Sequence, residues 1–229
     1  MTKRIWELDA LRGVCILGMV LVHLVYDLAS GSPITLPGWF LILQNWGGVL
    51  FFLISGISAT RGKRSLRRGI TVFVLGMGIT LCTSIFVILG SASGDCVIWF
   101  GVLHCLGLCM ILWPVFGRFP SPVLLIVSIV SIAAGVLLPR FPVNTPLLLW
   151  LGLMPTGFSS PDYFPLLPFF GFFLLGSIAG RRLYPNGQSL FPPVSGKVFS
   201  FFARCGRHSL IIYLAHQPLL LLLLRLMPF

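Results

Sequence analysis

Charged residues are scarce in this chain. Only 9% of its 229 residues are charged, and only five of them are acidic. Soluble domains carry about 25% charged residues, and a globular protein of this length has too little interior to hide a hydrophobic fraction of 57%. The shortage of charge excludes a soluble globular domain, and a mean hydropathy of +1.00 indicates that most of the chain lies in a bilayer.

The sequence also lacks the patterns of a disulfide framework, a metal site and a cleaved signal peptide. Four of its six cysteines lie inside apolar runs, where no disulfide framework is expected. The group His104, Cys105 and Cys109 matches no zinc-binding spacing, so we expect no metal. The first apolar run has no small-residue cleavage site and is expected to be retained. The net charge of +11 reflects membrane topology, and no nucleic-acid partner is expected.

Seven apolar runs approach the roughly 20 residues that a helix needs to cross the hydrocarbon. We therefore expect an all-α, polytopic transmembrane bundle of about seven spans, forming a single domain over residues 1–229. The expected spans are Leu11–Ala29, Phe40–Thr60, Gly69–Leu89, Val97–Phe116, Pro122–Leu138, Phe164–Gly180 and Ser209–Leu226. Residues Pro139–Pro161 are expected to form an outer loop, with a short interfacial or re-entrant helix over Leu147–Met154.

The basic residues give this bundle a direction. Of the 16 Lys and Arg residues, 14 fall at or before the start of the first span, just before the seventh, or after the second, fourth and sixth. Only Arg140 and Arg225 fall on the other side. The positive-inside rule then places the N-terminus in the cytoplasm, and an odd number of spans places the C-terminus outside.

One dense basic cluster follows the second span. Its members are Arg61, Lys63, Arg64, Arg67 and Arg68. The cluster is either a topology determinant that also binds anionic lipid, or a group of cations that holds the phosphates of a nucleotide-like ligand. Both interpretations stay open at this point.

Ionisable residues inside a bilayer are costly, so the few that fall within the spans are candidates for function. His23 and Asp27 are four residues apart on one face of the first span, with His23 roughly 9 Å from its outer end. A carboxylate that fixes the tautomer of a histidine prepares it as a general base. His104 reaches nearly the same depth in the fourth span, so the two histidines are expected to line one outward-facing cavity. A packing role is the alternative for each.

Two further polar groups fall at the ends of apolar runs. In the seventh span Tyr213, His216 and Gln217 share a helix face next to Pro218, which removes a backbone hydrogen bond and favours a kink. A lined cavity and a polar contact between helices both explain this face. Asp162 opens the sixth span and either closes the outer mouth of the cavity or belongs to a simple turn.

Five sequence motifs, taken in order, resemble one known family. They are Glu7–Gly13 with Met19–Leu28, Phe51–Gly56, Gly101–Gly107, Asp162–Pro168 with Gly171, and Gly206–Leu210 with Tyr213–Pro218. Together they resemble the bacterial relatives of the heparan-α-glucosaminide N-acetyltransferase catalytic domain. The opening Asp-x-x-Arg-Gly and the closing Tyr-Leu-x-His-x-Pro are shared with the broader membrane acyltransferases that O-acetylate cell-surface glycans. The resemblance covers nearly the whole chain, which is shorter than the animal enzymes and has fewer spans.

This resemblance implies a transmembrane acyltransferase of the bacterial cytoplasmic membrane. The donor would be cytoplasmic acetyl-CoA or another acyl-CoA, and the acceptor an amine or hydroxyl of an extracytoplasmic sugar or glycan. His23 falls at the position of the broader family's candidate catalytic histidine, and we expect Asp27 to orient it. The residues expected to bind substrate or cofactor are His104, Tyr213, His216, Gln217 and Asp162, with Arg12, Arg61 and Arg64 at the coenzyme phosphates.

Two alternatives to an enzyme stay open. A small transporter or flippase for a glycan or lipid precursor would use the same polar cavity, although the sequence shows no inverted repeat of the kind found in many transporters. A non-catalytic membrane scaffold would leave the intramembrane histidines without a purpose. The expected partners are the lipid bilayer, acyl-CoA and the glycan acceptor, and a homo-oligomer is left open.

Overall fold

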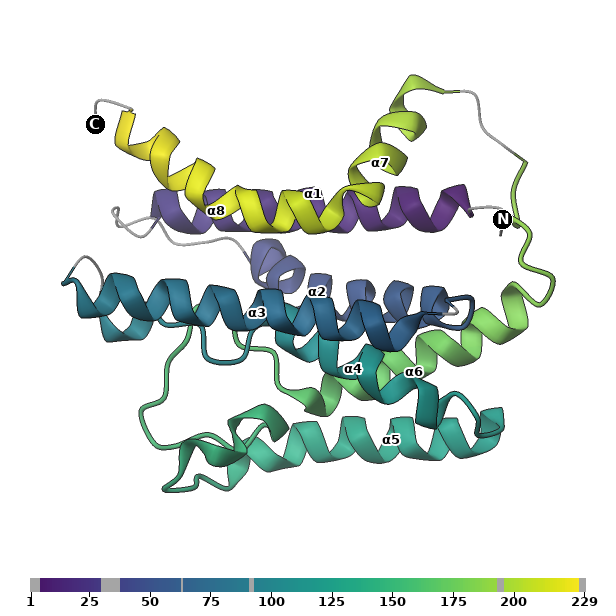
Figure 1. The fold of residues 1–229 in the computed structure, drawn as a ribbon, viewed down its shortest axis with the longest axis horizontal. Coiled ribbons are helices and arrows are strands. Elements are labelled where there is room, and N and C mark those ends of the chain that lie inside the picture. Colours follow the sequence, from purple (N-terminus) through teal and green to yellow (C-terminus); the bar gives the residue numbers. More distant parts are fainter. Residues whose placement is uncertain (1–4, 30–37, 63, 91–92, 193–195, 227–229) are drawn as a thin grey trace. The chain divides into compact units, whose positions relative to one another are not determined.

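A computed structural model describes residues 5–29, 38–62, 64–90, 93–192 and 196–226 of the chain. All regular structure in these ranges is helical, which confirms the expected all-α class (Figure 1). The chain divides into two compact units, which are described separately below. Unit 1 comprises Met1–Ile54 and Leu183–Phe229, and unit 2 comprises Ser55–Arg182.

Unit 1 is built around its first helix. The helices α7 and α8 both pack on α1 (Figure 1). The crossing of α1 and α7 is a contact between two glycines. A Cβ added to Gly13 would lie 3.0 Å from the backbone nitrogen of Gly206, and one added to Gly206 would lie 2.8 Å from that of Gly13. The absence of side chains there lets the two backbones touch. The helices are α1 (Trp6–Ala29), the first part of α2 (Gly38–Ala59), α7 (Lys197–Arg207) and α8 (Ser209–Leu226).

Unit 2 holds the end of α2 and the middle of the chain. Its helices are α3 (Ser65–Ile88), α4 (Val102–Phe116), α5 (Ser121–Leu137) and α6 (Leu166–Leu183), with 3-10 turns η1 (Gly94–Cys96), η2 (Leu138–Arg140) and η3 (Pro146–Leu151). Glycines again set the closest contacts. A Cβ at Gly107 of α4 would lie 2.6 Å from the backbone nitrogen of Phe73 on α3, and one at Gly171 of α6 would lie 2.7 Å from the carbonyl oxygen of Ser128 on α5. Unit 2 therefore consists of closely packed helices.

Five helices are long and apolar enough to cross a membrane. They are α1, α3, α5 with its extension to Arg140, α6 and α8. The chain is therefore a multi-pass membrane protein. The expected second and fourth spans correspond to shorter apolar helices, Trp46–Ala59 within α2 and Val102–Phe116. The count of seven spans, the direction of the termini and the bacterial membrane stay predictions.

Most helix ends lie close to the expected positions. The first helix begins at Trp6, five residues before the expected Leu11, and three further local features differ. The fourth helix begins at Val102 instead of Val97, because the backbone at Gly101 is extended. The short helix expected within residues 139–161 is a 3-10 turn at Pro146–Leu151. It stops at Gly152, whose φ of +114° favours glycine. The third difference is α7, which the search for long apolar runs did not predict.

Candidate functional site

The strongest cluster of polar side chains in unit 1 lies between α1 and α8. The imidazole of His23 on α1 faces that of His216 on α8, with ring centroids 4.9 Å apart and planes tilted by 56°. The Tyr213 ring lies 5.5 Å from the His216 ring, one turn earlier on α8. The helical period places Tyr213 and His216 on one face of α8. This face is directed at His23, the predicted general base.

The hydrogen bond of His216 identifies its tautomer. Its Nδ1 atom lies within hydrogen-bonding distance of the carbonyl oxygen of Tyr213. A carbonyl oxygen can only accept, so Nδ1 carries the hydrogen and the lone pair of the neutral ring is on Nε2. The His216 side chain is buried, Nε2 included. His216 can therefore accept a proton at Nε2 while its other nitrogen fixes the ring.

Asp27 is held from the same side by α8. The side-chain Nε2 of Gln217 donates a hydrogen bond of 3.0 Å to Asp27 Oδ2. No hydrogen bond joins His23 to Asp27 in the described ranges, and the two residues are one helical turn apart on α1. The Oε1 atom of Gln217 is buried, and no described residue donates to it. An acceptor oxygen in this position can receive an N–H or O–H group from a bound molecule.

In unit 2, His104 belongs to the start of α4 and is 1% exposed. Its Nδ1 accepts a hydrogen bond of 3.1 Å from the backbone N–H of Gly101. Thr80 Oγ1 donates to the carbonyl of Ile98 at 2.5 Å, so it accepts from His104 Nε2–H at 3.2 Å. The ring stacks on Phe100 with centroids 5.4 Å apart. Both ring nitrogens thus fasten the start of α4, and a direct role of His104 in substrate binding stays a prediction.

Asp162 also acts at the start of α4. Its Oδ2 accepts a hydrogen bond of 3.2 Å from the backbone N–H of Val102, the first residue of the helix. A carboxylate at a helix N-terminus is stabilised by the helix dipole. The next residue, Tyr163, donates its hydroxyl to the carbonyl of Leu149 at 2.7 Å, and burial raises the pKa of Tyr163 to about 12. Asp162 and Tyr163 therefore attach the loop that contains Leu149 to the start of α4.

The basic residues expected at the coenzyme phosphates are distributed over both units. Arg12 in unit 1 lies 3.4 Å from Asp9, one turn earlier on α1. In unit 2, Arg61 is half-buried after α2, and Arg64 is exposed at the N-cap of α3. A shared role of Arg12, Arg61 and Arg64 in holding phosphates stays a prediction.

Glu7 is a buried carboxylate that sequence reasoning did not single out as functional. It accepts hydrogen bonds from Ser189 Oγ, from the hydroxyl of Tyr184, and from the backbone N–H of Leu190 at 2.7 Å. Burial and the Glu7 carboxylate raise the pKa of Tyr184 to about 12. Glu7 thus ties the segment after α6 to the start of α1. The only sequence signal is an acid at the edge of an apolar run, because its partners lie far along the chain.

Comparison with known proteins gives one match. The family model described as "Heparan-alpha-glucosaminide N-acetyltransferase, catalytic" matches residues 4–218. The matched range contains the whole of the α1–α8 cluster, from His23 to Gln217. No curated protein and no solved structure matches the chain.

Proposed function

Because the chain belongs to the heparan-alpha-glucosaminide N-acetyltransferase catalytic family, we propose that it transfers an acetyl group from acetyl-CoA to an amine or hydroxyl of a sugar. Family membership gives the reaction class, a membrane acetyltransferase. The expected orientation supports the finer proposal, in which the donor is cytoplasmic and the glycan acceptor lies beyond the membrane. The family match extends through both units, which supports one functional domain over residues 1–229.

The observation that carries this proposal is the contact between His23 and His216. Acetyl transfer requires a base, because the acceptor nitrogen or oxygen loses a proton as it bonds to the thioester carbonyl carbon. His23 takes that proton while the carbon–sulfur bond breaks. The proton then passes to the coenzyme sulfur, which leaves as the thiol. The lone pair on His216 Nε2 provides a second proton acceptor beside His23, so the two rings can share the proton during the reaction.

Asp27 and Gln217 have supporting roles in this proposal. The Asp27 carboxylate, one turn from His23, stabilises the imidazolium that forms when His23 accepts a proton. The amide of Gln217 fixes this carboxylate through its N–H, and its Oε1 receives a hydrogen bond from the sugar amine or hydroxyl. The Tyr213 ring packs on His216 and limits its rotation. Each side chain thus either moves the proton or positions a group that does.

The remaining predicted residues have more distant tasks. Arg12, Arg61 and Arg64 are proposed to bind the coenzyme phosphates, because guanidinium groups form paired hydrogen bonds to phosphate oxygens. His104 and Asp162 stay candidates for acceptor binding, and their contacts favour an indirect role in which they position the start of α4.

The test is acetyl transfer by the purified chain in proteoliposomes, with labelled acetyl-CoA on one side and an amino sugar on the other. His23→Ala is expected to lower the rate by roughly 10²–10⁴-fold, the usual contribution of a general base. His208→Ala is the matched control, because His208 is exposed at the C-cap of α7. Transfer by His23→Ala at the rate of the unaltered chain would show that His23 is not the base. Sugar flux without acetylation would favour the transporter alternative.

A further inference from the structure

The helix α7 has two unlike sets of exposed side chains. Val198, Phe199 and Phe201, here called the α7 apolar face, are 64%, 47% and 54% exposed. Lys197, Arg204 and Arg207, here called the α7 cations, recur at spacings of seven and three and so lie along one strip of the helix. At 11 residues α7 is too short to cross a bilayer. Phe201 lies at the edge of the cation strip, because it follows Lys197 by four residues and precedes Arg204 by three. Short amphipathic helices that carry aromatic residues beside a strip of cations lie in the membrane interface.

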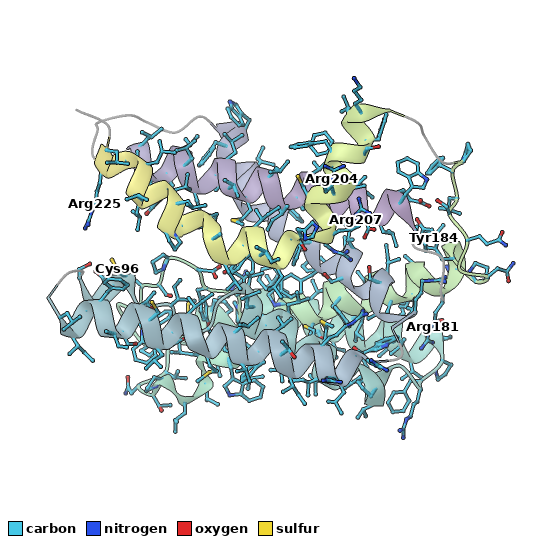
Figure 2. The ribbon with its side chains drawn as sticks, turned by 45° about the horizontal axis from the view of Figure 1, so that its top comes forward. Cys96, Arg181, Tyr184, Arg204, Arg207 and Arg225 are labelled. Atoms are coloured by element: carbon cyan, nitrogen blue, oxygen red, sulfur yellow. The ribbon has the colours of Figure 1, made fainter. Side chains whose placement is uncertain are left out.

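The α7 cations have no counterion in the described part of the chain. No Asp or Glu follows Asp162 in the sequence. In unit 1, the carboxylate of Asp9 lies 3.4 Å from Arg12, and Glu7 accepts hydrogen bonds from the segment after α6. Among the described residues no ion pair involves the α7 cations. Figure 2 shows two of them, Arg204 and Arg207, on α7 beside the N-terminal half of α1.

We propose that α7 lies in the headgroup layer of the cytoplasmic leaflet and binds anionic phospholipid. The α7 cations contact the lipid phosphates, and the α7 apolar face inserts among the upper parts of the acyl chains. A soluble phosphate ligand would satisfy the cations but would leave the apolar face in water. Lipid satisfies both, and an anionic leaflet attracts basic segments next to a transmembrane helix.

This binding would act on the helix that carries His23. The glycine contact between Gly13 and Gly206 joins the backbones of α1 and α7. The Trp6 ring of α1 and the Phe199 ring of α7 also pack in a T-shaped arrangement, with centroids 6.0 Å apart. Because α7 leads directly into α8, both helices of the His23–His216 cluster are attached to it. Anionic lipid is therefore expected to stabilise unit 1 as a whole.

The experiment titrates short-chain lipids into the full-length chain in neutral detergent and follows the thermal unfolding temperature. Phosphatidylglycerol is expected to raise it, and phosphatidylcholine of the same chain length is expected to have little effect. The double variant Arg204→Gln/Arg207→Gln is expected to bind phosphatidylglycerol roughly 30-fold more weakly. The matched control is Arg225→Gln, since Arg225 is an exposed cation near the far end of α8 (Figure 2).

Three outcomes would overturn the proposal. One is an equal response to the two lipids, and another is a double variant that keeps the full phosphatidylglycerol response. The third comes from a parallel titration with coenzyme A. If the double variant loses its response to coenzyme A but keeps its response to phosphatidylglycerol, the α7 cations bind a soluble phosphate ligand. Should the double variant fail to fold, salt on the unaltered chain decides, because about 1 M salt must abolish a response that depends on surface charge. None of these readouts depends on acetyl transfer, so they stand whether or not the proposed function holds.

Discussion

His23 and His216 come from helices at opposite ends of the described chain, and their imidazole rings lie with centroids 4.9 Å apart. The ring of His216 is fixed by its Nδ1–H bond to the Tyr213 carbonyl, which leaves Nε2 as the basic atom. The contact therefore joins a candidate base on α1 to a second proton acceptor on α8. This pairing can be tested one nitrogen at a time.

The variant His216→Asn separates the two nitrogens. An asparagine amide can still donate to the Tyr213 carbonyl, but it has no basic atom at the position of Nε2. We expect acetyl transfer to fall by roughly 10²-fold with little change in thermal stability. The measurement is kcat/KM as a function of pH. The His216→Asn variant should lack one of the pH-dependent changes in kcat/KM that the unaltered chain shows. The control His216→Phe removes both nitrogens and should also lower stability; a His216→Asn variant with an unchanged profile would exclude Nε2 from the reaction.

The glycine crossing of α1 and α7 predicts a steep loss of stability on adding one methyl group. Gly13→Ala and Gly206→Ala each place a Cβ against backbone atoms of the other helix, where no side chain can move aside. Overpacking of this kind costs at least about 1–3 kcal/mol. Gly18→Ala is the control on the same helix, because a Cβ there meets nothing within 4 Å. Thermal unfolding should show loss in the first two variants and no loss, or a small gain, in the third.

The hydrogen bonds at the start of α4 predict that Thr80→Val destabilises unit 2. Valine has the shape of threonine but cannot accept from His104 Nε2–H, so a buried donor loses its partner. The expected cost is about 1–3 kcal/mol. In the control Thr71→Val, the hydroxyl that is lost is exposed and bonds only within its own helix. Equal melting temperatures for the two variants would mean that the hydrogen bond between His104 and Thr80 does not contribute to the stability of unit 2.

Tyr184 predicts a loss of stability at high pH. Burial and the Glu7 carboxylate raise the pKa of Tyr184 in the folded chain to about 12, whereas an unfolded tyrosine titrates near pH 10. The neutral phenol therefore stabilises the fold fully below about pH 10, and this contribution is lost as pH rises towards 12. Tyr184→Phe should be less stable at neutral pH and should lose less between pH 10 and 12. Tyr26→Phe is the control, because Tyr26 is exposed; identical alkaline curves for all three chains would exclude the effect.

Long apolar runs predict helices well, and the sequence accordingly placed α8 at Ser209–Leu226, as found. The helical period also placed Tyr213, His216 and Gln217 on one face. It could not predict that this face meets His23 and Asp27. The rotation of one helix about another is set by tertiary contacts such as the one between Gly13 and Gly206. These two glycines lie far apart in the sequence, so no local pattern predicts their contact.

The remaining features depend on contacts that no local pattern contains. A search for runs of about 20 apolar residues cannot detect α7, because it is short and carries charge on one side. The similar depth of His104 and His23 suggested a common cavity. The hydrogen bonds of His104 to Gly101 and Thr80 are backbone and cross-helix contacts, which the composition of α4 does not reveal.

The hydrogen bond between Asp27 and Gln217 joins residues 190 positions apart. A ribosome adds about 5–20 residues per second, so α1 is made roughly 10–40 s before the segment that carries Gln217. During this interval the polar side chains of α1 have no α8 to contact, and a bare carboxylate is costly in lipid. The hydrogen bond to Asp27 and the contact between His23 and His216 can therefore form only after the last helix has been made. A partly synthesised chain therefore lacks the cluster of α1 and α8 side chains.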